Sequence, residues 1–183
     1  MESQQVTRAG LWWRLLESCV VIGGVLLLGG GALRAVAIFS VFEPFTTELR
    51  AEVSAAERLQ SYRIAVEGTP YVWAGGVLFF LGVMGSALLR WRHLRVYGWL
   101  FMGLTLAVLA CAAELWLTFA YDIPLVRLFA TGTPAVEQVE RYVLERVRHG
   151  GVVGTLAALA EWTILLFFVW RPLERHSCGQ STS

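Results

Sequence analysis

Four long apolar stretches constrain this chain more than any other feature of its sequence. They cover about residues 18–42, 70–89, 96–120 and 150–170, and charged residues bound each of them. A helix rises ~1.5 Å per residue, so about 20 apolar residues cross the ~30 Å hydrocarbon layer of a membrane. Helices satisfy their own backbone in lipid, which favours them for segments this long and this apolar. We therefore predict an all-α fold, a four-helix transmembrane bundle.

Composition supports a membrane protein and excludes two other classes. Hydrophobic residues make up 56% of the chain and charged residues 16%, well away from the balance of soluble domains. A formal net charge of +1 offers no basic surface for nucleic acid. Cys19, Cys111 and Cys178 are too few and too scattered for a disulfide scaffold, and we predict no disulfide. The chain reads as one integral membrane domain over 1–176, followed by a disordered cytoplasmic tail over 177–183.

The arginines predict the orientation in the membrane. All 15 basic residues are arginine, and seven of them lie in the N-terminal segment, the short middle loop and the tail. Seven more lie in the two longer loops, where nine carboxylates accompany them, so the positive-inside rule puts both termini in the cytoplasm. The same boundary holds five tryptophans: Trp12, Trp13, Trp91, Trp99 and Trp170. The lack of lysine suggests a GC-rich bacterial genome, and with it a multi-pass protein of the bacterial inner (plasma) membrane.

Each of the two longer loops is predicted to hold an amphipathic extracytoplasmic helix, over about 45–66 and 134–149. In the first loop, apolar residues recur among charges at nearly helical spacing, at Leu49, Val53, Ala56 and Leu59. In the second, Thr133 and Pro134 form a helix start, and one face then carries Val136, Val139, Val143 and Val147. These helices are either solvated caps on the bundle or a surface for partner proteins. The halves of the chain share this layout, yet too few residues are identical to assert a duplication.

Three ionisable residues lie deep within the apolar stretches. Arg34 and Glu114 each lie about eight residues below the outer end of a stretch, ~12 Å deep, and Glu161 lies ~16 Å deep. Such groups usually face the interior of a bundle, because charge is costly in lipid. Small residues precede Glu161 on one helical face, at Gly150, Gly154 and Ala158, and would let another helix approach. We predict that Arg34, Glu114 and Glu161 form one buried charge cluster.

The cluster has a structural and a functional interpretation. An Arg34–Glu114 ion pair that fixes the register of two helices would need no further purpose. One arginine cannot neutralise two carboxylates, however, so Glu161 is left either protonated or binding a proton, a cation or an amine. Because ionisable residues inside a membrane are candidates for function, the alternative is a binding site or a proton relay.

Other kinds of site receive little support. His149 follows Glu145 by one helical turn at the outer mouth of the last stretch, and is either an interfacial pH-sensitive residue or an ordinary helix end. No histidine lies within a stretch to hold haem, and no metal-ligand spacing or glycine-rich nucleotide loop is present in the sequence. We therefore predict no metal, no cofactor and no catalytic residue, and an enzyme is the weakest class.

Two function classes follow from these features. The first is a non-catalytic accessory or interaction subunit of a membrane complex, with other membrane subunits or a second copy of the chain as partners. The second is a small transporter or ligand-binding membrane protein that uses the cluster of arginine and glutamates.

Overall fold

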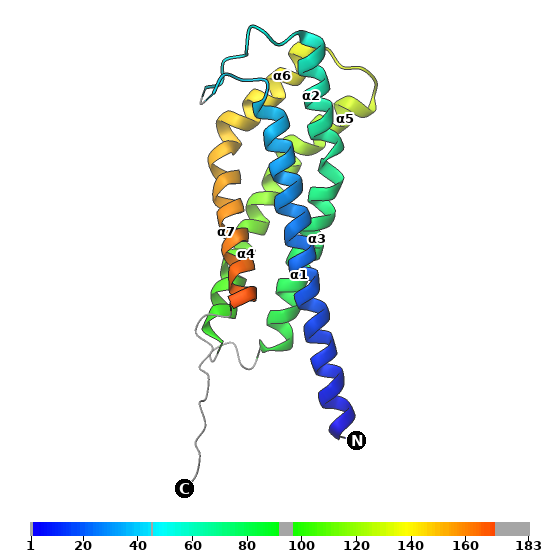
Figure 1. Ribbon diagram of the computed structural model, residues 1–183, viewed down its shortest axis with the longest axis vertical. Coiled ribbons are helices and arrows are strands. Elements are labelled where there is room, and N and C mark those ends of the chain that lie inside the picture. Colours follow the sequence, from blue (N-terminus) through cyan, green and yellow to red (C-terminus); the bar gives the residue numbers. More distant parts are fainter. Residues whose placement is uncertain (1, 45, 92–96, 171–183) are drawn as a thin grey trace.

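Four long helices run side by side to form the body of the protein (Figure 1). The computed structural model describes residues 2–44, 46–91 and 97–170. Within those ranges the fold is all-α, and four helices are long and apolar enough to cross a membrane. The long helices are α1 (Glu2–Phe39), α3 (Thr69–Leu89), α4 (Gly98–Leu117) and α7 (Gly151–Trp170). The predicted all-α fold with four apolar helices is confirmed, and it indicates a multi-pass membrane protein.

Three shorter helices gather at one end of the bundle: α2 (Ala55–Glu67), α5 (Ile123–Ala130) and α6 (Val136–Glu145). The start of α1 and the end of α7 lie at the opposite end (Figure 1). Two π-helical segments, η2 (Thr118–Asp122) and η3 (Arg146–Gly150), join α4 to α5 and α6 to α7. The end helices α5 and α6 are therefore continuations of the long helices, whereas α6 was predicted as a separate loop helix.

The first end helix begins later than the predicted residue 45, because its start is set by a capping box. The Ser54 hydroxyl accepts a hydrogen bond from the Glu57 amide at 3.3 Å, and the Glu57 carboxylate accepts one from the Ser54 amide at 2.8 Å. Leu49 and Val53 precede this cap, and Leu49 instead pairs with Phe42 in an isolated β-bridge. Their helical spacing in the sequence was misleading.

The helix predicted over 134–149 begins at Val136, because Ala135 has an extended backbone and acts as the N-cap. Val139 and Val143 are buried, and they pack in one apolar cluster with Tyr62 of α2. The end helices thus cover the bundle and contact each other, so their apolar faces are already occupied.

Glycines bring α1 and α3 into backbone contact. A methyl group added to Gly75 would lie 2.5 Å from the Leu27 amide nitrogen, and one added to Gly23 would lie 2.4 Å from the Phe79 amide nitrogen. Real Cβ atoms do not approach a backbone this closely, so these two positions require glycine. The helix that the glycines of α3 contact is α1.

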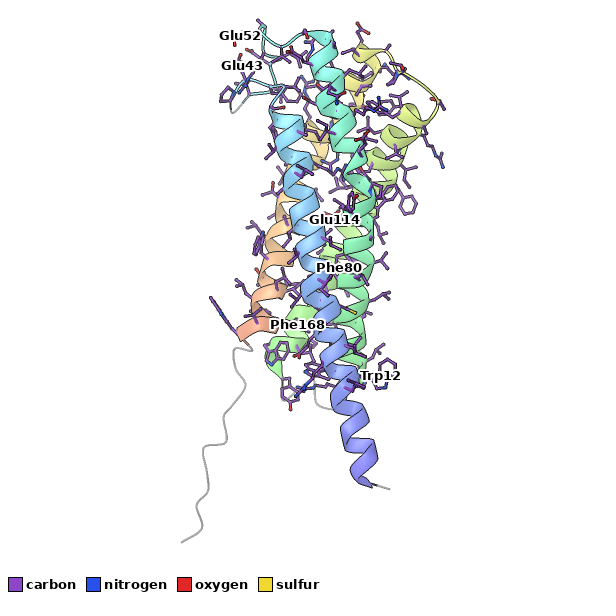
Figure 2. The ribbon with its side chains drawn as sticks, turned by 45° about the vertical axis from the view of Figure 1, so that its right-hand side comes forward. Trp12, Glu43, Glu52, Phe80, Glu114 and Phe168 are labelled. Carbon is purple, nitrogen blue, oxygen red and sulfur yellow. The ribbon has the colours of Figure 1, made fainter. Side chains whose placement is uncertain are left out.

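Aromatic residues fill the end of the bundle opposite the short helices, where Trp12 and Phe168 lie, while Glu43 and Glu52 lie at the other end (Figure 2). Trp99 is fully buried and meets Phe168 edge to face, with ring centroids 5.3 Å apart. The Arg90 guanidinium lies 3.7 Å from the centre of the Trp13 ring. Trp13 and Trp99, two of the five tryptophans predicted at the membrane boundary, have buried rings that belong to the core.

Candidate functional site

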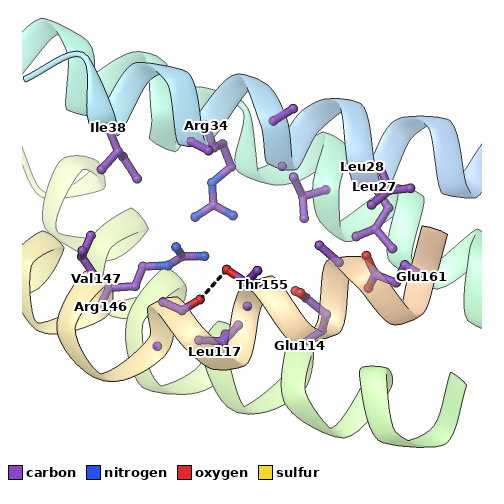
Figure 3. A pocket seen from close by; sticks show the side chains of 18 of the residues that line it. Leu27, Leu28, Arg34, Ile38, Glu114, Leu117, Arg146, Val147, Thr155 and Glu161 are labelled. Carbon is purple, nitrogen blue, oxygen red and sulfur yellow. Dashed lines mark hydrogen bonds between the residues drawn. The ribbon is translucent and has the colours of Figure 1, made fainter. Parts of the chain in front are cut away.

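A cavity of about 370 Å³ lies between α1, α4, η3 and α7 (Figure 3). Arg34, Glu114 and Glu161, the three deep ionisable residues of the sequence, all line it, and Arg146 joins them. The two arginines face each other at one end of the cavity, and the two glutamates lie at the other (Figure 3). Apolar and small side chains complete the walls, among them Leu27, Leu28, Gly154 and Ala158.

Arg34 pairs with Asp122 and not with Glu114, so the predicted Arg34–Glu114 pair is wrong. Its two terminal nitrogens donate to the two carboxylate oxygens of Asp122 at 3.1 and 2.6 Å. Both residues are buried, at 5% and 2% exposure. A forked pair of this kind is both strong and geometrically specific. The pair fixes α1 against the end of η2, and it leaves Glu114 without the partner assigned to it.

Arg146 binds the same carboxylate from a third helical segment. Its Nε donates to Oδ1 of Asp122 at 3.0 Å, so one aspartate holds two arginines. Asp122 ends η2 and Arg146 begins η3, which places both π-helical segments of the described chain at this cluster. π-Helical turns inside α-helices are rare, and those that occur are often found at functional sites.

Asp122 and Arg146 are site residues that were not predicted from the sequence. Both were assigned to the second outer loop, because the third stretch was predicted to end near residue 120 and the loop charges were considered only as a group. The available signal was the spacing between Glu114 and Asp122, since residues eight apart lie little more than two helical turns from each other. Continuation of the helix through η2 keeps Asp122 inside the bundle.

The two glutamates of the cavity lack an ion-pair partner within the described residues. Glu161 is 2% exposed, and its Oε1 has no hydrogen-bond partner there. The cavity and its ion-pair cluster together hold two guanidinium groups, on Arg34 and Arg146, and three carboxyl groups, on Asp122, Glu114 and Glu161. If every group were ionised, the sum would be one negative charge. One carboxyl group is therefore in excess, in a cluster that includes Asp122 and Arg146 beside the three predicted residues.

The remaining candidates lie away from the cavity or outside the described residues. His149 is exposed, and its Nδ1 lies 3.2 Å from the carbonyl oxygen of Glu145. Its pH-sensitive role stays a prediction. Cys19 and Cys111 are free thiols. Cys178 and the predicted tail over 177–183 lie outside the described residues. Over the ranges that are described, no three histidine, cysteine or acidic side chains come together as metal ligands.

Comparison with protein-family models, with curated proteins and with solved structures finds no match to this chain.

Proposed function

We propose that this protein is a ligand-binding membrane protein, and that its cavity takes a cationic group of the protonated-amine type. The observation that carries the proposal is the buried carboxyl group of Glu161, which lines the cavity without a hydrogen-bond partner at Oε1. A buried polar atom without a partner costs roughly 1–3 kcal/mol, and a ligand that donates a hydrogen bond would remove that cost.

The distribution of charge favours a cation over an anion. Asp122 already engages both arginines, and Figure 3 shows them at the end of the cavity away from Glu114 and Glu161. An ammonium group between the two glutamates would balance the excess carboxyl charge and could donate up to three hydrogen bonds. A volume of about 370 Å³ also falls within the range of small-molecule sites.

Glu161→Gln is expected to keep the fold and to weaken amine binding at least tenfold. Glutamine has the volume of glutamate and can make similar hydrogen bonds, but it cannot carry the negative charge that attracts an ammonium ion. The purified protein would be placed in nanodiscs of zwitterionic lipid, and its unfolding temperature would be followed while n-alkylammonium chlorides are added. A ligand that binds only the folded state raises that temperature.

Glu137→Gln is the matched control, because Glu137 is an exposed carboxylate on α6 outside the cavity. It should respond to the amines as the unaltered chain does. Equal stabilisation of the Glu161→Gln variant and the unaltered protein would show that the amine acts on the lipid or on another surface, and the proposal would be abandoned.

The other predicted function is an accessory or interaction subunit with further membrane subunits or a second copy as partners. It stays a prediction, and the unpartnered carboxyl in a cavity favours the ligand-binding alternative. We further propose the orientation predicted from the arginines, in which the protein spans a bacterial inner membrane and both termini lie on the cytoplasmic side. The start of α1 and the end of α7 at one end of the bundle support a shared side for the termini.

Cysteine labelling would test this orientation. In a chain whose native cysteines are replaced by serine, Gln138→Cys lies on the exposed face of α6, and Leu11→Cys lies near the start of α1. A membrane-impermeant maleimide is expected to label Gln138→Cys in spheroplasts with an intact inner membrane, and Leu11→Cys only after lysis. The reverse pattern would invert the proposed topology.

A further inference from the structure

The cavity opens on the side of the bundle, between α1 and α7. Five of the residues that line it are exposed, and they form what we call the side window: Ala32 and Phe39 on α1, and Gly151, Thr155 and Trp162 on α7. Phe39 and Gly151 lie toward the short helices and Trp162 toward the other end, with Thr155 between them on α7. The window runs from Ala32 to Phe39 on α1, roughly 11 Å, and from Gly151 to Trp162 on α7, roughly 16 Å.

The two helices that border the side window meet beyond it. A methyl group added to Gly24 would lie 2.6 Å from a terminal carbon of Leu165, so α1 and α7 are in close contact there. Gly24 is two helical turns from Ala32, and Leu165 is nearly one turn from Trp162. On the side of the glutamates away from the short helices, α1 and α7 are therefore in contact, and the window lies between them on the side toward the short helices.

The outer surface of the protein around the side window is apolar, as expected of a surface that faces lipid. The exposed residues beside it on both helices are apolar: Leu33 and Val36 on α1, and Val152, Leu156 and Leu159 on α7. They belong to two of the four helical segments with the length and hydropathy of membrane spans. A window framed by such residues faces acyl chains, so a molecule dissolved in the bilayer can reach Glu161 without crossing water.

We propose that the ligand is a single-chain amphiphilic amine, which enters from the bilayer through the side window with its ammonium group at Glu161 and Glu114 and its alkyl chain between α1 and α7. This inference rests on the proposed amine site and adds the apolar chain and the route. Charge complementarity selects the headgroup, because the cavity has one carboxyl in excess. The small residues of the window leave room for the chain.

The first test compares butylammonium with dodecylammonium in phosphatidylcholine nanodiscs at neutral pH. The long chain concentrates the amine in the bilayer, from which the side window is reached. Dodecylammonium is therefore expected to stabilise the protein at concentrations at least 100-fold lower than butylammonium, and the Glu161→Gln variant should lose the response. Equal potency of the two amines, both dependent on Glu161, would leave the amine site standing and overturn the bilayer route. No Glu161-dependent response to either amine would overturn both.

The second test narrows the side window. Thr155→Trp and Ala32→Trp place a large ring in the window from opposite helices, and each is expected to weaken dodecylammonium binding at least tenfold. Ala112→Trp is the control, since Ala112 is an exposed small residue of α4 that does not line the cavity. Using both variants guards against one that fails to fold, which size-exclusion chromatography would reveal. Dodecylammonium binding of unaltered strength in a folded window variant would overturn the proposed route.

Discussion

Asp122→Ala is expected to destabilise the folded protein by roughly 3–5 kcal/mol, the largest effect of any single charge removal in this chain. Asp122 accepts three hydrogen bonds from two arginines, and it is the carboxylate that both of them share. Removing it leaves the Arg34 guanidinium buried without a counter-ion, next to the like charge of Arg146. Repulsion between the two arginines adds to the loss of their hydrogen bonds.

Substitution of either arginine should destabilise the folded protein less than Asp122→Ala does, and Arg34→Ala should cost more stability than Arg146→Ala. Arg34→Ala leaves Asp122 bound to Arg146, whereas Arg146→Ala leaves the forked Arg34–Asp122 pair intact. Arg146 is also the more exposed of the two, so its loss should cost least. Thermal unfolding of the purified variants in mild detergent would rank them.

A double variant that removes one charge of each sign distinguishes the loss of charge pairing from the loss of packing. Asp122→Ala together with Arg34→Leu removes the buried unpaired guanidinium and leaves only the more exposed Arg146 without its partner, so the double variant should be more stable than Asp122→Ala alone. A double variant at least as unstable as the single one would mean that Asp122 acts through packing and not as a counter-ion.

The long helices could be predicted from the sequence because membrane insertion depends on length and hydropathy, both of which are local. The second stretch was predicted over 70–89 and α3 covers Thr69–Leu89, while the last was predicted over 150–170 and α7 covers Gly151–Trp170. Charged residues mark these limits plainly. The side of α7 that faces the cavity could also be predicted, since Gly154, Ala158 and Glu161 recur at helical spacing and all line the cavity.

The partner of Arg34 could not be predicted, because it depends on whether a helix continues past an apolar stretch. A polar residue at the end of an apolar stretch is typical of a loop. In this protein the helix instead continues through the π-helical segment η2, which keeps Asp122 buried. Hydropathy holds no signal for a π-turn. Arg146 was missed for the same reason, because η3 joins an amphipathic helix to a spanning one.

The side window could not be predicted from the sequence either, since it depends on where α1 and α7 cross. Glycines and alanines were visible on α1, but their pattern does not say which ones contact a neighbour. Gly23 contacts α3 and Gly24 contacts Leu165 of α7, whereas Gly29 has open space around it. Neighbouring glycines thus have different surroundings, and only the packed bundle distinguishes them.

This difference between neighbouring glycines leads to the second large expected effect, at the crossing of α1 and α3. Gly75→Ala places a methyl group 2.5 Å from the amide nitrogen of Leu27 and 2.9 Å from the carbonyl oxygen of Gly23. Both atoms belong to the backbone of α1, so a side-chain rotation cannot relieve the clash and the helices have to separate. Overpacking of this kind costs about 1–3 kcal/mol and can cost more when backbones move.

Gly76→Ala is a control one residue away, because its methyl group would meet only a terminal carbon of Leu27 at 3.8 Å, an ordinary contact. Alanine also favours a helix over glycine by up to ~1 kcal/mol, so this variant should be neutral or slightly more stable. Thermal unfolding in detergent is expected to separate the pair clearly. Since lipid is as apolar as the helix surfaces, close packing is a main source of their association. Equal stabilities for the two variants would mean that α1 and α3 are not in backbone contact, and the wall of the cavity that Arg34 and Leu27 form on α1 would then have no fixed position relative to Val72 of α3.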